Sequence, residues 1–398
     1  MKPPFIPGLE LSAALCTAVE PILQRHFPGL GYAVARIARG SDVLGFDDQR
    51  STDHYWGPLL EVFVSDEDRE RYRQQIHDVL AAELPFQVRG YSTHFRPFEG
   101  KEAHFGRLGH IAQLGNMASA VERPINHGVS VMSVPAFFRA WLQVDPLREL
   151  EPVEWLLMSE QNLRMVTSGR VFVDGPGELS RARRALTYYP HEVWLYLLAA
   201  QWARIGQEEA FLGRTAEAGD ELGSRLVAAR LVRDVMRLAF ILERTYAPYT
   251  KWFGTAFNRL RCASELGPHL EATLAATDWH TREAHLNRAY EHVAGMHNAL
   301  GMTEPVAETV ASFHGRPYMV IHADRFAETT EQAITSEVVR SWPKRAGSVN
   351  QWADATDVLD RPSLLPRLRS FYTASSRAAG AGLQVSGERR EYPAEPPM

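Results

Sequence analysis

The sequence has few cysteines and no long apolar segment, and these absences narrow the class of protein. Cys16 and Cys262 are the only cysteines among 398 residues, which excludes a disulfide framework and is typical of a reducing compartment. No run of 18 apolar residues occurs, and the N-terminal segment MKPPFIPGLELS lacks the basic stretch and apolar core of a signal peptide. We therefore expect a cytoplasmic protein with no membrane span and no membrane partner.

An excess of positive charge is also absent. The 48 acidic and 43 basic side chains give a formal net charge of −5, and the isoelectric point is about 6.3. A nucleic-acid partner is therefore not expected, although a local basic groove is compatible with this composition. The sequence contains no HExxH, GxSxG or GxxxxGK[ST] motif, so it does not indicate a helical zinc site, a serine hydrolase or a P-loop enzyme.

The composition is that of a soluble globular protein, with 45% hydrophobic and 23% charged residues. A chain of 398 residues is too long for one ordinary core, so at least two domains are expected. The first part of the chain mixes two periodicities. Helices are predicted over 9–27, 65–84 and 135–142, and strands over 31–38, 59–65, 85–92 and 128–134.

Helical periodicity dominates after residue 145, and the one convincing late strand is RPYMVIHADRF (316–326). Helical patterns cover 152–167, 178–186, 190–209, 219–247, 250–266 and 268–300. We predict an α+β fold with a mixed sheet and flanking helices at the N-terminus. The predicted units are an α/β domain over 1–145, a helical domain over 146–305, a C-terminal extension over 306–373 and a disordered tail over 374–398.

The stretch RGSDVLGFDDQRSTDHYWGP (39–58) carries the strongest chemical signal. Gly40-Ser41 ends a strand pattern, and a glycine there lets the backbone approach phosphates closely while its neighbours offer N–H groups and a hydroxyl. Asp53 precedes the next strand pattern, where a carboxylate can hold Mg²⁺. These residues suit phosphoryl or nucleotidyl transfer. A solvated acidic hairpin loop is the alternative, because the same residue types are common in turns.

This stretch resembles the signature of the nucleotidyltransferase superfamily, which includes polymerase-beta-like enzymes and aminoglycoside nucleotidyltransferases. The shared pattern is a hydrophobic strand, Gly-Ser, a spacer and then Asp-x-Asp or Asp-x-Glu. The wider chain, over roughly residues 10–360, is similar to an uncharacterised bacterial branch of that superfamily, a domain-of-unknown-function family. The matching segments are GRVFVDGPGEL (169–179), YYPHEVW (188–194), LAAQWARIGQEEAFLGR (198–214) and ERTYAPYTKWFGTAF (243–257).

The resemblance implies that Mg²⁺ and ATP or another NTP bind in a cleft between the two main domains. The implied activity is transfer of a nucleoside monophosphate from the Mg-NTP to a small-molecule or protein acceptor. By the same resemblance, Asp53 is the expected metal ligand, and Asp53 and Lys251 are the expected catalytic residues. The expected nucleotide contacts are Gly40, Ser41, Ser51 and Lys251.

Residue 55 departs from the superfamily pattern. A second metal carboxylate is expected there, on a strand face shared with Asp53, but Tyr55 offers a neutral phenol, which is a poor Mg²⁺ ligand. Glu61 lies too far along an extended strand to take the same place. The remaining substitutes are loop acids: Asp42, Asp47 and Asp48. A degenerate protein that binds a nucleotide or partner without turnover is therefore the alternative function.

Basic residues of the helical half offer a second signal. Lys251 either projects across the cleft onto phosphates or lies along packed aromatic residues. Arg230, Arg233 and Arg237 follow i, i+3, i+7 spacing and share one helix stripe. That stripe faces either phosphates or interface acids.

Overall fold

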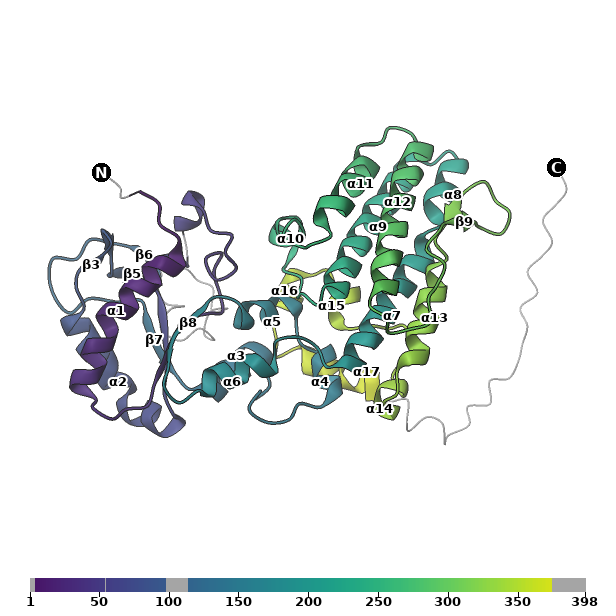
Figure 1. Cartoon of the computed structure of the whole chain (residues 1–398). Helices are drawn as coiled ribbons and strands as arrows, with labels where there is room; N and C mark the ends of the chain where they lie inside the picture. The colour runs from purple at the N-terminus through teal and green to yellow at the C-terminus, as the bar shows by residue number, and fades with distance from the viewer. Residues whose placement is uncertain (1–3, 54, 98–113, 374–398) are drawn as a thin grey trace.

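The computed structural model of the chain describes residues 4–53, 55–97 and 114–373. Figure 1 shows two lobes side by side, a sheet lobe formed by the N-terminal part and a helical lobe formed by the second half. The predicted α+β fold is confirmed, because a mixed sheet with flanking helices is followed by a largely helical portion. The predicted disordered tail over 374–398 lies outside the described residues.

The central sheet has four strands in the order β7-β2-β1-β8. Strand β1 is antiparallel to β2 and β8, and β2 is parallel to β7. Strands β1, β2 and β7 lie within ranges predicted from the sequence, whereas β8 comes from the part assigned to helices. The chain thus returns to the sheet after residue 145, and the domain boundaries stay a prediction. The strands are β1 Ala33–Arg36, β2 Leu60–Phe63, β7 Val129–Met132 and β8 Arg170–Asp174.

Both faces of the sheet are covered, because its strands carry apolar side chains on both sides. Val34 and Val62 pack with Leu15 and Leu80 from the helices α1 and α2 on one face. On the other face, Phe63 meets Phe137 of α3 with ring centroids 5.3 Å apart, and this core continues into the helical lobe. The helices are α1 Gly8–His26, α2 Asp66–Glu83 and α3 Val134–Leu142.

The described residues also form three two-stranded antiparallel pairs, two in the sheet lobe and one, β9 with β10, in the helical lobe (Figure 1). The single strand predicted over 85–92 is instead a hairpin, because Arg89 and Gly90 both have positive φ and turn the chain back on itself. The late strand predicted over 316–326 is short, and the helix α13 replaces its second half. The pairs are β3 Gln87–Val88 with β4 Tyr91–Ser92, β5 Phe95–Pro97 with β6 Leu114–Met117, and β9 Ala311–Ser312 with β10 Met319–Val320.

The helical lobe is built around α7, α9, α12 and α13, which pack on buried aromatic residues. Trp202 of α7 stacks on Phe326 of α13 with ring centroids 4.2 Å apart. Within the described ranges, no helix is long and apolar enough to cross a membrane. The helices from α4 to α13 are α4 Pro152–Leu156, α5 Glu160–Thr167, α6 Glu178–Ala185, α7 His191–Glu208, α8 Phe211–Glu217, α9 Glu221–Leu242, α10 Thr250–Phe257, α11 Ala263–Ala275, α12 Trp279–Ala299 and α13 Ala323–Ala333. Short helices follow at α14 Glu337–Arg340, α15 Val349–Trp352, α16 Thr356–Leu359 and α17 Arg369–Thr373.

One aromatic side chain of the loop after β1 ties the two lobes together. Phe46 stacks on Trp252 of α10 at 5.2 Å between ring centroids. The Arg259 guanidinium lies 4.2 Å from the centre of the Phe46 ring and donates a hydrogen bond of 2.6 Å to the Gly45 carbonyl. These contacts hold the loop against the amino end of α10, so the loop and the helix face the same space.

Candidate functional site

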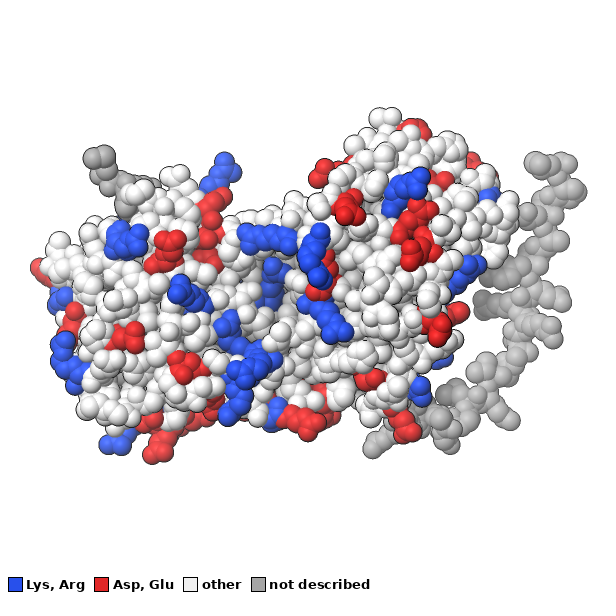
Figure 2. All heavy atoms as spheres, in the orientation of Figure 1, with Lys and Arg blue, Asp and Glu red and all other residues white. Residues whose placement is uncertain are grey.

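A cavity of about 710 Å³ lies between the two lobes. This volume is within the usual range for small-molecule sites, about 300–1,000 Å³. Figure 2 shows basic side chains gathered in the hollow between the lobes. The cavity is lined by the loop after β1, the start of α5, the middle of α9, the amino end of α10 and the segment 350–360.

Four of the five predicted site residues line this one cavity. Gly40 and Ser41 come from the loop after β1, Ser51 from the 3₁₀ helix η1 (Gln49–Asp53), and Lys251 from the first turn of α10. The backbone of the predicted metal ligand, Asp53, ends η1, and its side chain lies outside the described part of the structure. The structure brings these residues together, and their roles toward a nucleotide stay predictions.

Arg36, the last residue of β1, does not line the cavity itself but holds the loop that does. Its Nε donates to Asp42 Oδ2 at 2.8 Å, and its Nη2 donates to Asp42 Oδ1 at 3.1 Å. The same Nη2 donates to the carbonyl oxygens of Arg39 at 2.7 Å and Tyr55 at 3.3 Å, and Nη1 donates to Glu61 Oε1 at 3.3 Å. One guanidinium therefore fixes both the Gly40-Ser41 loop and the chain that follows η1.

The charge of this cluster is unbalanced, because one guanidinium serves two carboxylates. The Arg36 side chain is 1% exposed and that of Glu61 is 6% exposed. Asp42 takes the bidentate contact, and Glu61 receives a single bond from the guanidinium and one of 3.1 Å from the Ile37 N–H. Burial raises the pKa of Glu61 to about 7, because it outweighs the attraction of Arg36.

Gly40 is required by this internal cluster. Its φ is +136°, a conformation that L side chains rarely adopt. A Cβ at this position would lie 2.0 Å from Asp42 Oδ1 and 2.7 Å from Arg36 Nη2. The glycine thus lets the loop fold over the Arg36–Asp42 pair, and it leaves the backbone next to the cavity.

The acids weighed as substitute metal ligands are mostly engaged elsewhere. Asp42 and Glu61 bind Arg36, while Asp47 Oδ2 accepts bonds from the Gly8 N–H at 2.7 Å and from Trp56 Nε1 at 3.0 Å. Asp48 lines the cavity, but its Oδ1 accepts from the N–H groups of the first turn of η1. Two of the three loop acids weighed as substitutes, Asp42 and Asp47, are therefore occupied by the protein itself, and so is Glu61.

The described residues do not form a two-metal centre. Two-metal catalysis requires carboxylates that bridge the ions. Within the described ranges, no group of three or more His, Cys, Asp and Glu residues is arranged to hold a metal ion. The expectation that Asp53 and residue 55 share a strand face is wrong, because residues 49–53 form η1 and β2 begins at Leu60. Tyr55 has a φ of +49° and lies in the connection between them.

The amino end of α10 supplies the second wall of the cavity. Its first residues, Thr250 and Lys251, line the cavity, and the Lys251 Nζ lies 5.0 Å from the centre of the Trp252 ring. The preceding Tyr249 N–H donates to Gln161 Oε1 at 2.8 Å, which fixes the start of the helix against α5. The amino end of a helix carries partial positive charge, so this wall favours anions.

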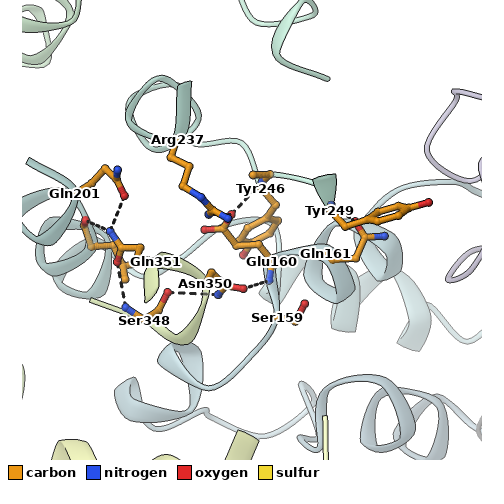
Figure 3. A network of polar contacts seen from close by, with 12 residues as sticks. Ser159, Glu160, Gln161, Gln201, Arg237, Tyr246, Tyr249, Ser348, Asn350 and Gln351 are labelled. Atoms are coloured by element: carbon orange, nitrogen blue, oxygen red, sulfur yellow. Dashed lines mark hydrogen bonds and ion pairs between the residues drawn. The ribbon is translucent and has the colours of Figure 1, made fainter. Parts of the chain in front are cut away.

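A polar network around Glu160 forms the rear of the cavity (Figure 3). The Glu160 N–H donates to Asn350 Oδ1 at 2.9 Å, and its Oε2 accepts from the Ala247 N–H at 3.2 Å. Arg237 of α9 approaches the same carboxylate, with Nη1 3.9 Å from Oε2. Burial raises the pKa of Glu160, while Arg237 and the Ala247 N–H act in the opposite sense. The network joins α5, the segment before α10 and the segment 348–351 into one wall.

The predicted arginine stripe divides between two roles. Arg230 forms an ion pair of 2.5 Å with Glu208 and does not line the cavity. Arg233 and Arg237 line it and contact acids of other segments, Arg233 through an ion pair with Asp354. For the two cavity arginines, interface acids are therefore the partners that the structure provides.

Arg36 and Glu160 were not identified from the sequence. Arg36 holds the loop after β1, and Glu160 joins α5 to the segments that line the cavity beside it. A charged residue inside the apolar strand pattern GYAVARIA was the available signal for Arg36, since a buried arginine requires partners. No sequence signal distinguishes Glu160, which lies in an ordinary helix start, from an exposed first-turn acid. Its partners come from α9 and the segment 348–351, which only the fold brings near.

Comparisons with known proteins found a family model and a solved structure that are similar to parts of this chain. The family model of a domain of unknown function, DUF4037, matches residues 155–253. No curated protein matches the sequence. The solved structure of a nucleotidyltransferase-like protein from Exiguobacterium sibiricum 255-15 is similar over 72% of this chain and 76% of that chain, with 12% sequence identity and a TM-score of 0.29.

Proposed function

We propose that the cavity between the lobes binds a nucleotide, with its phosphates toward Gly40-Ser41 and Lys251. The observation that carries this proposal is the convergence of Gly40, Ser41, Ser51 and Lys251 on one cavity. Backbone N–H groups of a glycine loop and of a helix start, together with a lysine ammonium, are groups that bind phosphate oxygens. The resemblance of residues 39–58 to the nucleotidyltransferase signature supports the same ligand.

Aromatic residues support the placement of a base in the same cavity. Tyr55, Tyr249 and Trp252 line it, and aromatic rings provide stacking surfaces that accept any base. The Arg39 guanidinium lies 5.6 Å from the centre of the Tyr55 ring and pairs with Asp360 at 2.6 Å on the same side of the cavity. A phosphorylated aromatic ligand matches this mixture of basic and aromatic groups.

Between turnover and binding alone, the geometry favours binding alone. Arg36 holds Asp42 and Glu61, and Asp47 accepts two hydrogen bonds from the protein. These acids are thereby withdrawn from metal coordination. We therefore favour a nucleotidyltransferase-like protein that binds its nucleotide without transferring it.

Nucleotidyl transfer from a Mg-NTP to a small-molecule or protein acceptor is the second candidate function. The placement of Asp48 on the cavity, five residues before the predicted metal ligand Asp53, favours it. In this case Asp53 and Asp48 would hold Mg²⁺, Ser41 and the α10 start would orient the phosphates, and Lys251 would neutralise their charge.

Calorimetric titration with ATP, GTP, CTP and UTP, with and without EDTA, tests the binding proposal. We expect at least one NTP to bind in the presence of EDTA, and Lys251→Ala to weaken that binding by about tenfold, the loss typical of one charge-assisted contact. Lys344→Ala is the matched control, because Lys344 is exposed and does not line the cavity. A flat titration with all four NTPs, or equal binding by the two variants, contradicts the proposal.

Pyrophosphate release separates the two functions. The favoured function predicts no release from any NTP with Mg²⁺ present. Release that requires Mg²⁺ and disappears in Asp53→Ala would instead establish transfer. Asp357→Ala is the control for that variant, because Asp357 lies on α16 and does not line the cavity.

A further inference from the structure

The α9 wall of the cavity, formed by Val232, Arg233, Met236 and Arg237, holds an arginine whose hydrogen-bonding capacity is unused. The Arg237 side chain is 12% exposed, and its guanidinium lies 5.7 Å from the centre of the Phe253 ring. Its closest acid contact is the 3.9 Å approach to Glu160. Among the described residues, no hydrogen bond from this guanidinium is found, although an arginine has five N–H donors.

This arrangement leaves the guanidinium open to a ligand. Among the described residues, no Arg237 nitrogen is a fully buried atom without a hydrogen-bond partner, so its donors are accessible and not sealed in the core. The Arg237 side chain lines the cavity, so a group entering from that side can reach it. An anionic ligand group would supply the acceptors that the protein omits.

Arg233 extends the same basic surface by one turn. It pairs with Asp354, whose side chain is 71% exposed and lies in the segment between α15 and α16. An exposed carboxylate is held weakly by such a pair and can turn away into solvent. Arg233 is therefore available to an incoming anion at low cost.

The charge balance of the α9 wall favours a single negative charge. Glu160 offsets the charge of Arg237, and the displaceable Asp354 offsets that of Arg233. When Asp354 turns away, one net positive charge remains. A monoanionic carboxylate matches that charge, and the planar guanidinium matches its two oxygens.

The rest of the α9 wall is apolar. Val232 and Met236 line the cavity with the two arginines, as does Phe253 of α10, whose ring lies next to the Arg237 guanidinium. Such side chains favour a hydrocarbon or aromatic body rather than a sugar or a second phosphate. The ligand implied by this wall is amphipathic, with one acidic end.

We propose that the α9 wall binds the carboxylate of a small molecule with an apolar body, through Arg237 and Arg233. Beside the nucleotide this molecule is the second ligand of the cavity, a statement that rests on the proposed function. Carboxylate binding itself depends only on the α9 wall and is measured without nucleotide.

The test uses the full-length protein and 3-phenylpropionate, with 3-phenylpropan-1-ol as a neutral probe of the same shape. Binding is followed by ligand-observed NMR at pH 7 over a millimolar range of probe. We expect the carboxylate to bind at least about tenfold more tightly than the alcohol, because one charge-assisted pair contributes that much. Equal binding of the two probes, or no binding of either, overturns the proposal.

Variants assign the binding to the α9 wall. Arg237→Met should weaken 3-phenylpropionate binding by about tenfold and leave the alcohol unaffected. Arg230→Met is the matched control, since Arg230 lies on the same helix but outside the cavity. If Arg237→Met alone fails to fold, the double variant Glu160→Gln with Arg237→Met removes both charges and should show the same loss. Unchanged carboxylate binding in the folded variant overturns the proposal.

A nucleotide arm separates this inference from the proposed function. The NTP that binds in calorimetry is added at saturation, and 3-phenylpropionate binding is measured again. Unchanged or tighter binding supports two neighbouring ligands. Direct competition would mean that the arginines belong to the nucleotide site and overturns the inference. If no NTP binds but the carboxylate does, the proposed function fails and the carboxylate site stands.

Discussion

Two arginines, Arg36 behind the Gly40-Ser41 loop and Arg237 on the cavity, are buried with different sets of partners. Arg36 is 1% exposed and its guanidinium donates to two carboxylates and two backbone carbonyls. Arg237 is 12% exposed and has one acid at 3.9 Å. Both lie in elements that carry hydrophobic cores, so burial alone does not tell them apart.

This difference separates a buried charge that stabilises the fold from a buried charge that is available to a ligand. A guanidinium whose three nitrogens all donate to the protein fixes a loop and has little capacity left for a second partner. A guanidinium that faces a cavity with its donors unused has capacity for a partner from outside. Arg36 accordingly holds the loop that lines the cavity, and Arg237 is placed to bind a ligand that enters the cavity.

The largest effect is expected at Arg36. Arg36→Met leaves Asp42 and Glu61 buried without their cation, which should lower the free energy of unfolding by about 3–5 kcal/mol. Urea denaturation followed by tryptophan fluorescence measures this loss. A loss below about 1 kcal/mol would mean that the cluster does not hold the loop. Arg36 would then not differ from Arg237 in its role.

The next largest effect is expected in the pH dependence of stability, through the Glu61 carboxyl group. Its folded pKa is raised from the ordinary 4.5 to about 7 by burial, so the folded protein holds the proton more tightly than the unfolded chain. The contribution of Glu61 to the free energy of unfolding should therefore fall by roughly 3 kcal/mol as pH rises from 4.5 to about 7. Above about pH 7 this contribution should stay constant. Glu61→Gln should remove that slope. Denaturation at several pH values measures it, and parallel curves for the two proteins would refute the assignment.

A smaller loss of stability is expected at Arg237. Arg237→Met should lower the free energy of unfolding by about 1–2 kcal/mol, because Glu160 keeps the Ala247 N–H as a partner. Arg230→Met should change it by less than about 0.5 kcal/mol. The same denaturation assay applies. A loss as large as that of Arg36→Met would mean that Arg237 mainly stabilises the fold, and the difference between the two arginines would not hold.

The smallest effect on stability is expected at Asp354. Asp354→Asn removes an exposed partner of Arg233 and should change the free energy of unfolding by less than about 0.5 kcal/mol. It should nevertheless tighten 3-phenylpropionate binding several-fold, because Arg233 loses a competing carboxylate. Ligand-observed NMR on the variant measures the gain, and weaker binding would count against a role for Arg233.

Local patterns predicted most of the elements, because periodicity and end signals act within a few residues. The helix over 65–84 was expected with Ser65 at its start, and Ser65 Oγ accepts the Asp68 N–H at 3.0 Å. Strand β8 was not expected, since a five-residue strand between two helices has too little pattern to stand out. Its place in the sheet depends on β1, its partner far back in the chain.

The candidate site also has features that depend on local sequence and features that depend on the tertiary structure. The sequence by itself determined that Gly40-Ser41 lies in a turn after a strand and that Lys251 lies at a helix start, since both depend on neighbouring residues. Only the tertiary structure decided that these segments face one cavity, that Arg36 occupies Asp42 and Glu61, and that Arg237 keeps its donors for that cavity. Side-chain partners are set by which elements pack together, and packing joins residues that no local pattern connects.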